Sequence, residues 1–287
     1  MSVDIEHLRS WIGRTETLED VVTPVPVTAL SATLDRADPA PQAGDGLPPL
    51  WHWLYFLPIR RQSDLGPDGH PKRGGLLPPV ELPRRMWAGG RLEFLSPLRI
   101  GEAIRRVSTV ADVTLKEGST GPLVFVLVRH EITGPAGLAI REEHDIVYRD
   151  MPSPGQAKPA PKPAASPKAA SWRRKIEPDD VLLFRYSALT FNGHRIHYDR
   201  RYVTETEGYP GLIVHGPLLA TLLLDLLRWE MAGSQVARFR FRALQPIFDI
   251  APFAVCGDAP DETGKVRLWV ETPEGAPAME AEAVIKR

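Results

Sequence analysis

The chain has 287 residues, which fits one large domain or two of ordinary size. Its 35 Lys and Arg residues nearly balance its 36 Asp and Glu residues, so no overall basic charge favours nucleic acid as a partner. The single cysteine, Cys256, excludes an intrachain disulfide framework and any multi-cysteine metal site. The 29 prolines, about 10% of the chain where about 5% is usual, disfavour a long helical bundle.

Signals for a membrane or for export are not evident in the sequence. The opening stretch MSVDIEHLRSWIGRTETLED is rich in acidic residues and lacks the apolar run of a secretory signal. The most apolar stretch, residues 212–227, is interrupted by His215 and Asp225 and is shorter than the roughly 18–20 clean residues that a span requires. We therefore expect a cytoplasmic protein that has no membrane partner.

A proline-rich segment divides the chain. Six of the 29 prolines lie between Met151 and Trp172, among alanines and lysines. Such a segment has too few large apolar side chains to repay the entropy of ordering, and its composition favours an extended spacer over a structured surface loop. The sequence thus predicts a domain at residues 1–150, a linker at 151–172 and a second domain at 173–287.

The first half begins with apolar stretches that predict helices near residues 5–12 and 25–34. Alternating or strongly apolar runs then predict strands at 51–58, 91–94, 103–116, 123–133 and 139–148. The glycine pairs at 74–75 and 89–90 fit no phosphate-binding fingerprint and predict turns.

The second half opens with VLLFRYSALTF and continues with a helix from Pro217 to about Ala232. Pro217 suits the first turn of this helix and Gly233 its C-terminal end. The helix is apolar on nearly every face, which is typical of a buried helix. Strands are predicted at 237–244, 254–256, 265–272 and 278–285. Each half thus reads as a helix followed by an antiparallel meander, an α+β arrangement in which the sheet wraps around the helix.

The polar residues that precede this helix are the best candidates for chemistry. Three of the eight histidines, His194, His197 and His215, fall within one short stretch. His194 and His197 with nearby Asp199 suggest a metal site, but no further ligand pair has convincing spacing, so we expect no metal and no other cofactor. Proton transfer suits the histidines better, although purely local hydrogen bonding is the alternative.

Gly216 follows His215 directly and lies at the start of the buried helix. The unpaired N–H groups and the positive end of the helix dipole at this position are able to stabilise an oxyanion. A nucleophile is less well supported, because there is no G-x-S-x-G elbow and Cys256 has no nearby histidine in the sequence.

YSALTFNGHRIHYD, followed by GLIVHGPLLATLL, resembles the MaoC-like (R)-specific hydratases and dehydratases of the hotdog superfamily. The match is closest to the double-hotdog branch that includes mesaconyl-C4-CoA (3-methylfumaryl-CoA) and itaconyl-CoA hydratases and the mitochondrial type 2 hydroxyacyl-thioester dehydratase. A looser similarity includes LPRRMWAGGRLEF in the first half. The resemblance implies a double hotdog with a non-catalytic N-terminal half and a catalytic C-terminal half.

The resemblance also implies roles for residues. In the family pattern D-x-N-P-x-H the histidine falls on His197, while the aspartate position is occupied by Asn192. His197 is then the general base on water and a candidate to return the proton to C2. Asn192 holds that water, and the Gly216 N–H stabilises the enolate of an enoyl thioester. His194 or Asp199 is expected to tune His197. Further candidate substrate-binding residues are Arg84, Arg85, His194, Arg195 and His215.

The implied activity is that of a hydro-lyase, which reversibly adds water across the C2=C3 bond of an enoyl-CoA. Mesaconyl-C4-CoA or itaconyl-CoA is the preferred substrate, and dehydration of straight-chain 3-hydroxyacyl thioesters is the alternative. A hotdog thioesterase and a non-catalytic acyl-CoA-binding protein are the competing classes. A homodimer is expected, because homodimers are the commonest assembly.

Overall fold

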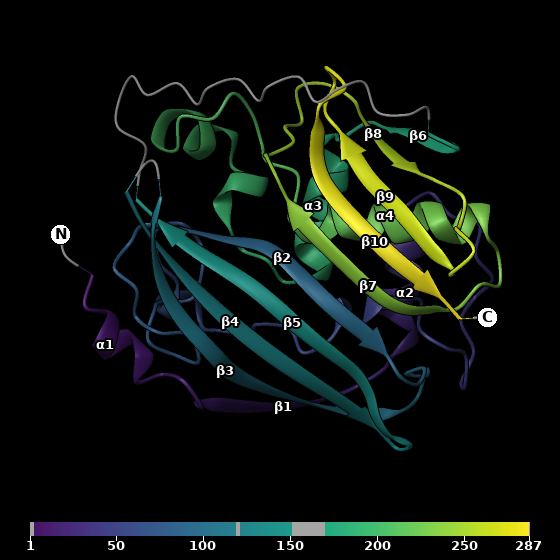
Figure 1. The fold of residues 1–287 in the computed structure, drawn as a ribbon, viewed down its shortest axis with the longest axis horizontal. Helices are drawn as coiled ribbons and strands as arrows, with labels where there is room; N and C mark the ends of the chain where they lie inside the picture. The colour runs from purple at the N-terminus through teal and green to yellow at the C-terminus, as the bar shows by residue number, and fades with distance from the viewer. Residues whose placement is uncertain (1–2, 119–120, 151–169, 287) are drawn as a thin grey trace.

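The computed structural model describes residues 3–118, 121–150 and 170–286. In these residues the strands form one antiparallel sheet in the order β1-β3-β4-β5-β2-β7-β10-β9-β8-β6, which Figure 1 shows from its broad side. The first half of the chain supplies β1 (Thr15–Val21), β2 (Arg84–Phe94), β3 (Ala103–Gly118), β4 (Gly121–Gly134) and β5 (Gly137–Arg149). The second half supplies β6 (Trp172–Ile176), β7 (Val236–Ala243), β8 (Phe253–Gly257), β9 (Lys265–Glu271) and β10 (Pro277–Ile285).

The helices lie mainly on one side of this sheet (Figure 1). They are α1 (Ile5–Arg9), α2 (Pro24–Thr33), α3 (Asp180–Leu189) and α4 (Gly216–Glu230). The predicted α+β class is confirmed, and α2 and α4 lie where helices were expected. The segment VLLFRYSALTF, to which the sequence assigned no element, forms most of α3.

The predicted strand at 51–58 is wrong, because Trp51–Leu54 is a short 3-10 helix. Leu50 before it has a left-handed backbone with φ of 70°, which turns the chain so that Trp51 and Leu54 both enter the core. The alternation of apolar and polar residues could not distinguish this 3-10 helix from a strand, since its aromatic side chains pack inside although the segment has no strand partner. The strands β1 and β6, which were not predicted, form the two edges of the sheet.

The two halves join where β2 pairs with β7, and this pairing contains the glycine pair that was expected to form a turn. That expectation is wrong: Gly89 and Gly90 lie within β2, next to a bulge that follows Trp87. A Cβ on Gly89 would lie 2.6 Å from the carbonyl oxygen of Phe241 in β7. Glycine is therefore required here by the close approach of two strands.

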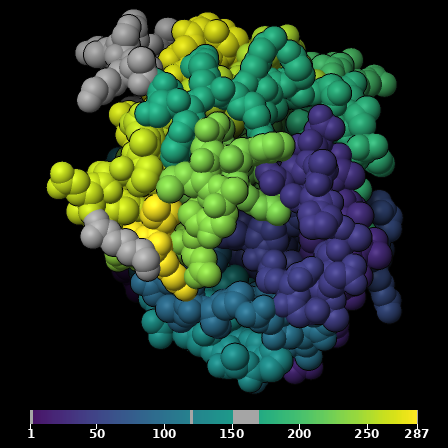
Figure 2. Space-filling model, turned by 90° about the vertical axis from the view of Figure 1, so that its right-hand side faces the viewer, coloured from purple at the N-terminus to yellow at the C-terminus, as the bar shows by residue number. Residues whose placement is uncertain are grey.

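The boundary between the predicted domains falls between β5 and β6, and residues 151–169 of the predicted linker lie outside the described residues. The halves also meet at their helices, since α2 packs against α3. In Figure 2 the purple N-terminal segments lie directly against the green segments of the second half. No helix in the described ranges is long and apolar enough to cross a membrane.

Helix α4 forms the centre of the core. Residues 218–227 are all buried, and the helix packs against β8, β9, β10 and β6. One member of this run is charged: the Asp225 carboxylate pairs with Arg36 at 2.7 Å and with Arg174 at 2.8 Å. Arg36 follows α2 and Arg174 lies in β6, so one buried carboxylate connects three parts of the chain.

We predict that Asp225→Ala lowers the free energy of unfolding by about 3–5 kcal/mol, because the buried guanidinium of Arg36 is left with Asp38 alone and Arg174 loses this ion pair. Urea denaturation measures this change. The matched control is Arg201→Ala, which breaks an exposed pair with Glu205 and should cost less than about 1 kcal/mol. Equal effects of the two substitutions would contradict a central role for Asp225.

Candidate active site

His197 has the clearest orientation among the candidate residues. It lies in a 3-10 turn, Arg195–His197, after α3, and its side chain is buried. Its Nδ1 donates to the carbonyl oxygen of Ile213 at 2.7 Å, since a carbonyl only accepts. The lone pair is therefore on Nε2. Burial lowers the pKa of His197 to about 4, so the imidazole is neutral near pH 7 and able to accept a proton.

His215 lies against this base. The two rings stack with their centroids 3.7 Å apart. The Nε2 of His215 is 2.8 Å from the Ser187 hydroxyl, while its Nδ1 is buried without a hydrogen-bonding partner among the described residues. Burial, together with the nearby His197, holds the pKa of His215 well below its usual value. His215 is thus a neutral, fully buried ring that stacks against His197.

Gly216 begins α4, as predicted from the sequence. If it carried a Cβ, the carbonyl oxygen of Trp87, at 4.0 Å, would be the nearest heavy atom in the described chain. The N–H groups of the first turn of a helix have no intrahelical acceptor. This open position at the start of a buried helix suits a carbonyl or enolate oxygen.

Asn192 and His194 lie in the turn between α3 and His197. The Asn192 side-chain oxygen accepts the His194 backbone N–H at 3.0 Å, so it shapes this turn and keeps one lone pair for a water. The His194 ring is 5.4 Å from that of His197, and burial and neighbouring histidines lower its pKa to about 2. The predicted tuning of His197 by Asp199 has no support in the contacts, because Asp199 pairs with Arg195 and accepts the Tyr202 N–H.

A loop from the first half reaches this site, and no pattern in the sequence predicted it. Gly69 is so close to Gly193 that a Cβ on Gly69 would lie 1.9 Å from the Gly193 carbonyl oxygen. The Arg195 backbone N–H donates to the Asp68 carbonyl oxygen at 2.9 Å. The loop places His70 with its ring 4.0 Å from that of His194. The four imidazoles of residues 70, 194, 197 and 215 therefore form a row across both halves.

The three candidate arginines differ in their contacts. Arg84 is held by Glu207 at 3.2 Å, and Arg195 is held by Asp199 at 2.7 Å. The charge of Arg85 acts on Tyr148 and on both His70 and His194. Arg85 is thus the candidate arginine whose charge acts on the histidines.

The metal-ligand set considered from the sequence is not assembled, because His197 and Asp199 are directed to other partners. In the described residues the donor atoms of Asp68, His70 and His194 lie within 4.8 Å of one another. His70 Nδ1 and the Asp68 carboxylate are 2.9 Å apart, so we interpret these two residues as a hydrogen-bonded pair.

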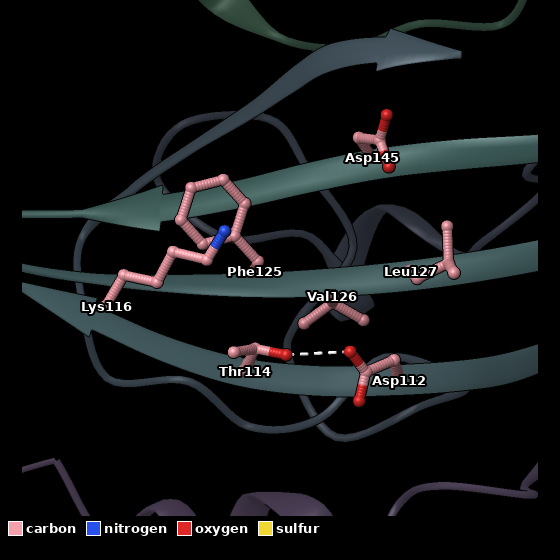
Figure 3. A pocket seen from close by; sticks show the side chains of 7 residues that line it. All are labelled: Asp112, Thr114, Lys116, Phe125, Val126, Leu127 and Asp145. Atoms are coloured by element: carbon pink, nitrogen blue, oxygen red, sulfur yellow. Dashed lines mark hydrogen bonds between the residues drawn. The ribbon is translucent and has the colours of Figure 1, made fainter. Parts of the chain in front are cut away.

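A shallow hollow elsewhere on the molecule is unrelated to these residues. It lies over β3, β4 and β5 and is lined by side chains that include Lys116, Phe125 and Asp145 (Figure 3). Asp145 and His144 are neighbours in β5 and point to opposite faces of the sheet. His144 stacks on Trp87, close to Gly216, so the hollow is on the opposite face from the histidine row.

We predict that Gly69→Ala opens the contact between the loop and the histidine turn, which amide hydrogen exchange at Arg195 would detect as faster exchange. The control is Gly74→Ala, whose φ of +95° is similarly positive but which meets nothing within 4 Å. Both substitutions carry about 1–2 kcal/mol of left-handed backbone strain. Similar exchange at Arg195 in the two variants would argue against the contact.

Comparison with known proteins places these features in a family. The model of the hydroxyacyl-thioester dehydratase type 2 family matches residues 50–249. The chain is 48% identical to the mesaconyl-C(4)-CoA hydratase of Chloroflexus aurantiacus over 95% of both chains. It is 29% identical to the mitochondrial hydroxyacyl-thioester dehydratase type 2 of Schizosaccharomyces pombe, over 88% of this chain and 92% of that protein.

Solved structures agree on the fold. A MaoC-like dehydratase from Phytophthora capsici has a TM-score of 0.69 at 15% identity, over 99% of this chain and 98% of that one. A Mycobacterium tuberculosis protein described as a double hotdog has a TM-score of 0.58 at 12% identity, over 96% of both chains. The double hotdog expected from the sequence is confirmed, and the chain belongs to the hydroxyacyl-thioester dehydratase type 2 family of MaoC-like proteins.

Proposed function

We propose that this protein is a hydro-lyase that adds water reversibly across the C2=C3 bond of an enoyl-CoA, with mesaconyl-C4-CoA as its substrate. The observation that carries this proposal is the 48% identity to a mesaconyl-C(4)-CoA hydratase along 95% of both chains. A neutral, oriented histidine beside an open helix N-terminus supplies the chemistry that this reaction needs.

In this mechanism the thioester carbonyl accepts a hydrogen bond from the Gly216 N–H. The Nε2 of His197 takes a proton from water as the water oxygen bonds to C3. The electron pair of the C2=C3 bond moves toward C1, and the resulting enolate oxygen is stabilised at the positive end of α4. Asn192 holds the water through its free lone pair, and His215 keeps the His197 ring in place by stacking.

The substrate's second carboxylate supports a role for Arg85. In mesaconyl-C4-CoA this carboxylate is attached to the carbon that receives the hydroxyl group, so its counter-cation must lie close to the base. Arg85 suits this role better than Arg84 or Arg195, because its charge acts on the histidines and the guanidinium groups of the other two are held by carboxylates. A guanidinium binds a carboxylate with two parallel hydrogen bonds.

Dehydration of straight-chain 3-hydroxyacyl thioesters is the second candidate, favoured by the 29% identity to the S. pombe dehydratase. We further propose that the chain acts in the cytoplasm and as a homodimer.

Activity on crotonyl-, mesaconyl- and itaconyl-CoA distinguishes between the candidate substrates. Release of free thiol would indicate a thioesterase, and tight binding without turnover would indicate an acyl-CoA-binding protein.

We predict that His197→Ala lowers kcat for mesaconyl-C4-CoA hydration at least a hundredfold, because the water loses its general base. Loss of absorbance of the conjugated enoyl thioester measures the rate. His7→Ala, at an exposed histidine of α1, is the control and should retain wild-type activity. If His197→Ala is as active as the control, His197 is not the base.

We predict that Arg85→Ala lowers kcat/KM for mesaconyl-C4-CoA by roughly 10- to 100-fold, the range expected for a lost charged hydrogen bond, and leaves crotonyl-CoA hydration nearly unchanged. The control is Arg91→Ala, since Arg91 lies in the same strand but pairs with Glu143 and Asp145 on the other face. An equal loss with both substrates would show that Arg85 does not recognise the carboxylate.

A further inference from the structure

The loop that reaches the site from the first half carries an ordered carboxylate–imidazole pair. One Asp68 oxygen accepts the backbone N–H of His70 at 3.0 Å, and the other lies 2.9 Å from His70 Nδ1. Because an ionised carboxylate only accepts hydrogen bonds, His70 carries the shared proton on Nδ1. The Nε2 of His70 is then the reactive nitrogen, and the side chain is 21% exposed, so a ligand is able to reach it.

Hydration requires two proton movements, and the second half supplies one clear group for them. The proton that leaves water has an acceptor in His197 Nε2. For the proton that must reach C2, the Asn192 amide does not titrate, so His197 would have to return the proton that it has just taken from water unless another histidine supplies one. His215 is fully buried, and its Nε2 is engaged with the Ser187 hydroxyl, so it does not face the substrate.

His194 and His70 remain as candidates for the second group, and their surroundings differ. Burial lowers the pKa of His194 to about 2, and no carboxylate bonds to its ring in the described residues. Burial also lowers the pKa of His70, and the positive charges of Arg85 and Arg73 act in the same direction. The hydrogen bond and charge of Asp68 oppose these effects, so His70 is the member of the row best able to hold a proton.

We propose that His70, held by Asp68, is a second catalytic residue of this site and belongs to the half that the family resemblance would leave without a catalytic role. The inference rests on the proposed function. As the water oxygen bonds to C3, its proton passes to His197 Nε2. The enolate then re-forms the thioester carbonyl as its electron pair takes a proton from His70 Nε2. Solvent removes the proton from His197 and returns one to His70, so the net change is the addition of one water.

The arrangement gives each histidine one task. His197 has a carbonyl partner, which fixes its tautomer without favouring its charged form as a carboxylate would. His70 has a carboxylate partner, which stabilises the imidazolium. Environments that separate the proton affinities of two titratable groups are typical of acid–base pairs in active sites. The Gly69–Gly193 contact holds the two groups in register across the halves.

The test compares His70→Gln, Asp68→Asn and the loop control Lys72→Ala in the full chain with mesaconyl-C4-CoA. We expect His70→Gln to lower kcat at least a hundredfold with KM within about threefold, and Lys72→Ala to match wild type. The kcat–pH profile is the decisive readout. Wild type should lose activity as the pH rises through the pKa of His70, which burial holds below its usual value, and His70→Gln should lack this limb. Asp68→Asn should shift the limb to lower pH, because the imidazolium loses its stabilising carboxylate.

Two results would overturn this role of His70. One is activity of His70→Gln within threefold of wild type, and the other is a slow variant that keeps the wild-type pH limbs, which would indicate a structural effect only. Loss of wild-type activity on chelation, restored by Zn²⁺, would likewise replace proton transfer with metal binding. Failure of the proposed function itself is distinct, since the wild-type protein would then hydrate none of the enoyl thioesters.

Discussion

The close approach of β2 to β7 is the constraint on which the rest of the site depends. Gly89 and Gly90 remove the side chains that would hold these strands apart, so the two halves share one sheet. The bulge just before Gly89 shifts Trp87 and brings its carbonyl oxygen next to Gly216 at the start of α4. The same strand carries Arg85, whose charge reaches the histidines. A site assembled from both halves is therefore a direct consequence of this pairing.

Burial then determines the protonation states on which the chemistry relies. Helix α4 is buried over residues 218–227, and the histidines near its N-terminus share its water-poor surroundings. Desolvation disfavours imidazolium and keeps His197 neutral, as a base must be. In the row of four imidazoles His70 is hydrogen-bonded to a carboxylate, and the charge and hydrogen bond of that carboxylate oppose the lowering of its pKa by burial. The proposed division between proton donor and proton acceptor therefore depends on Asp68.

The sequence predicted much of this structure, and its failures have physical causes. The helix that begins at Gly216 and the candidate role of His197 were accessible because capping residues and a local motif identify these positions over a few residues. The glycines of β2 were mistaken for a turn because their partner strand lies about 150 residues away in the chain, and no local pattern reports that contact. Asp68 and His70 were missed for the same reason. Their motif, Asp-Gly-His between a proline and a proline, reads as an ordinary turn until the fold sets it against Gly193.

The inner face of the first half also has a polar layer that bears on the site. Although burial opposes ionisation, the charges and hydrogen bonds of His144 and His52 hold the pKa of Glu142 well below its usual value. Glu142 bonds to His52 at 3.0 Å and to His144 at 2.5 Å, and the His144 ring stacks on Trp87 with centroids 3.9 Å apart. A buried carboxylate is tolerated only where its partners stay in place, so this layer fixes His144 and, through it, Trp87.

Because the Trp87 carbonyl is the neighbour of Gly216, the buried layer stabilises the surface against which the thioester would lie. The first half thus places the Trp87 carbonyl beside Gly216 and brings His70 and Arg85 toward the histidines of the second half.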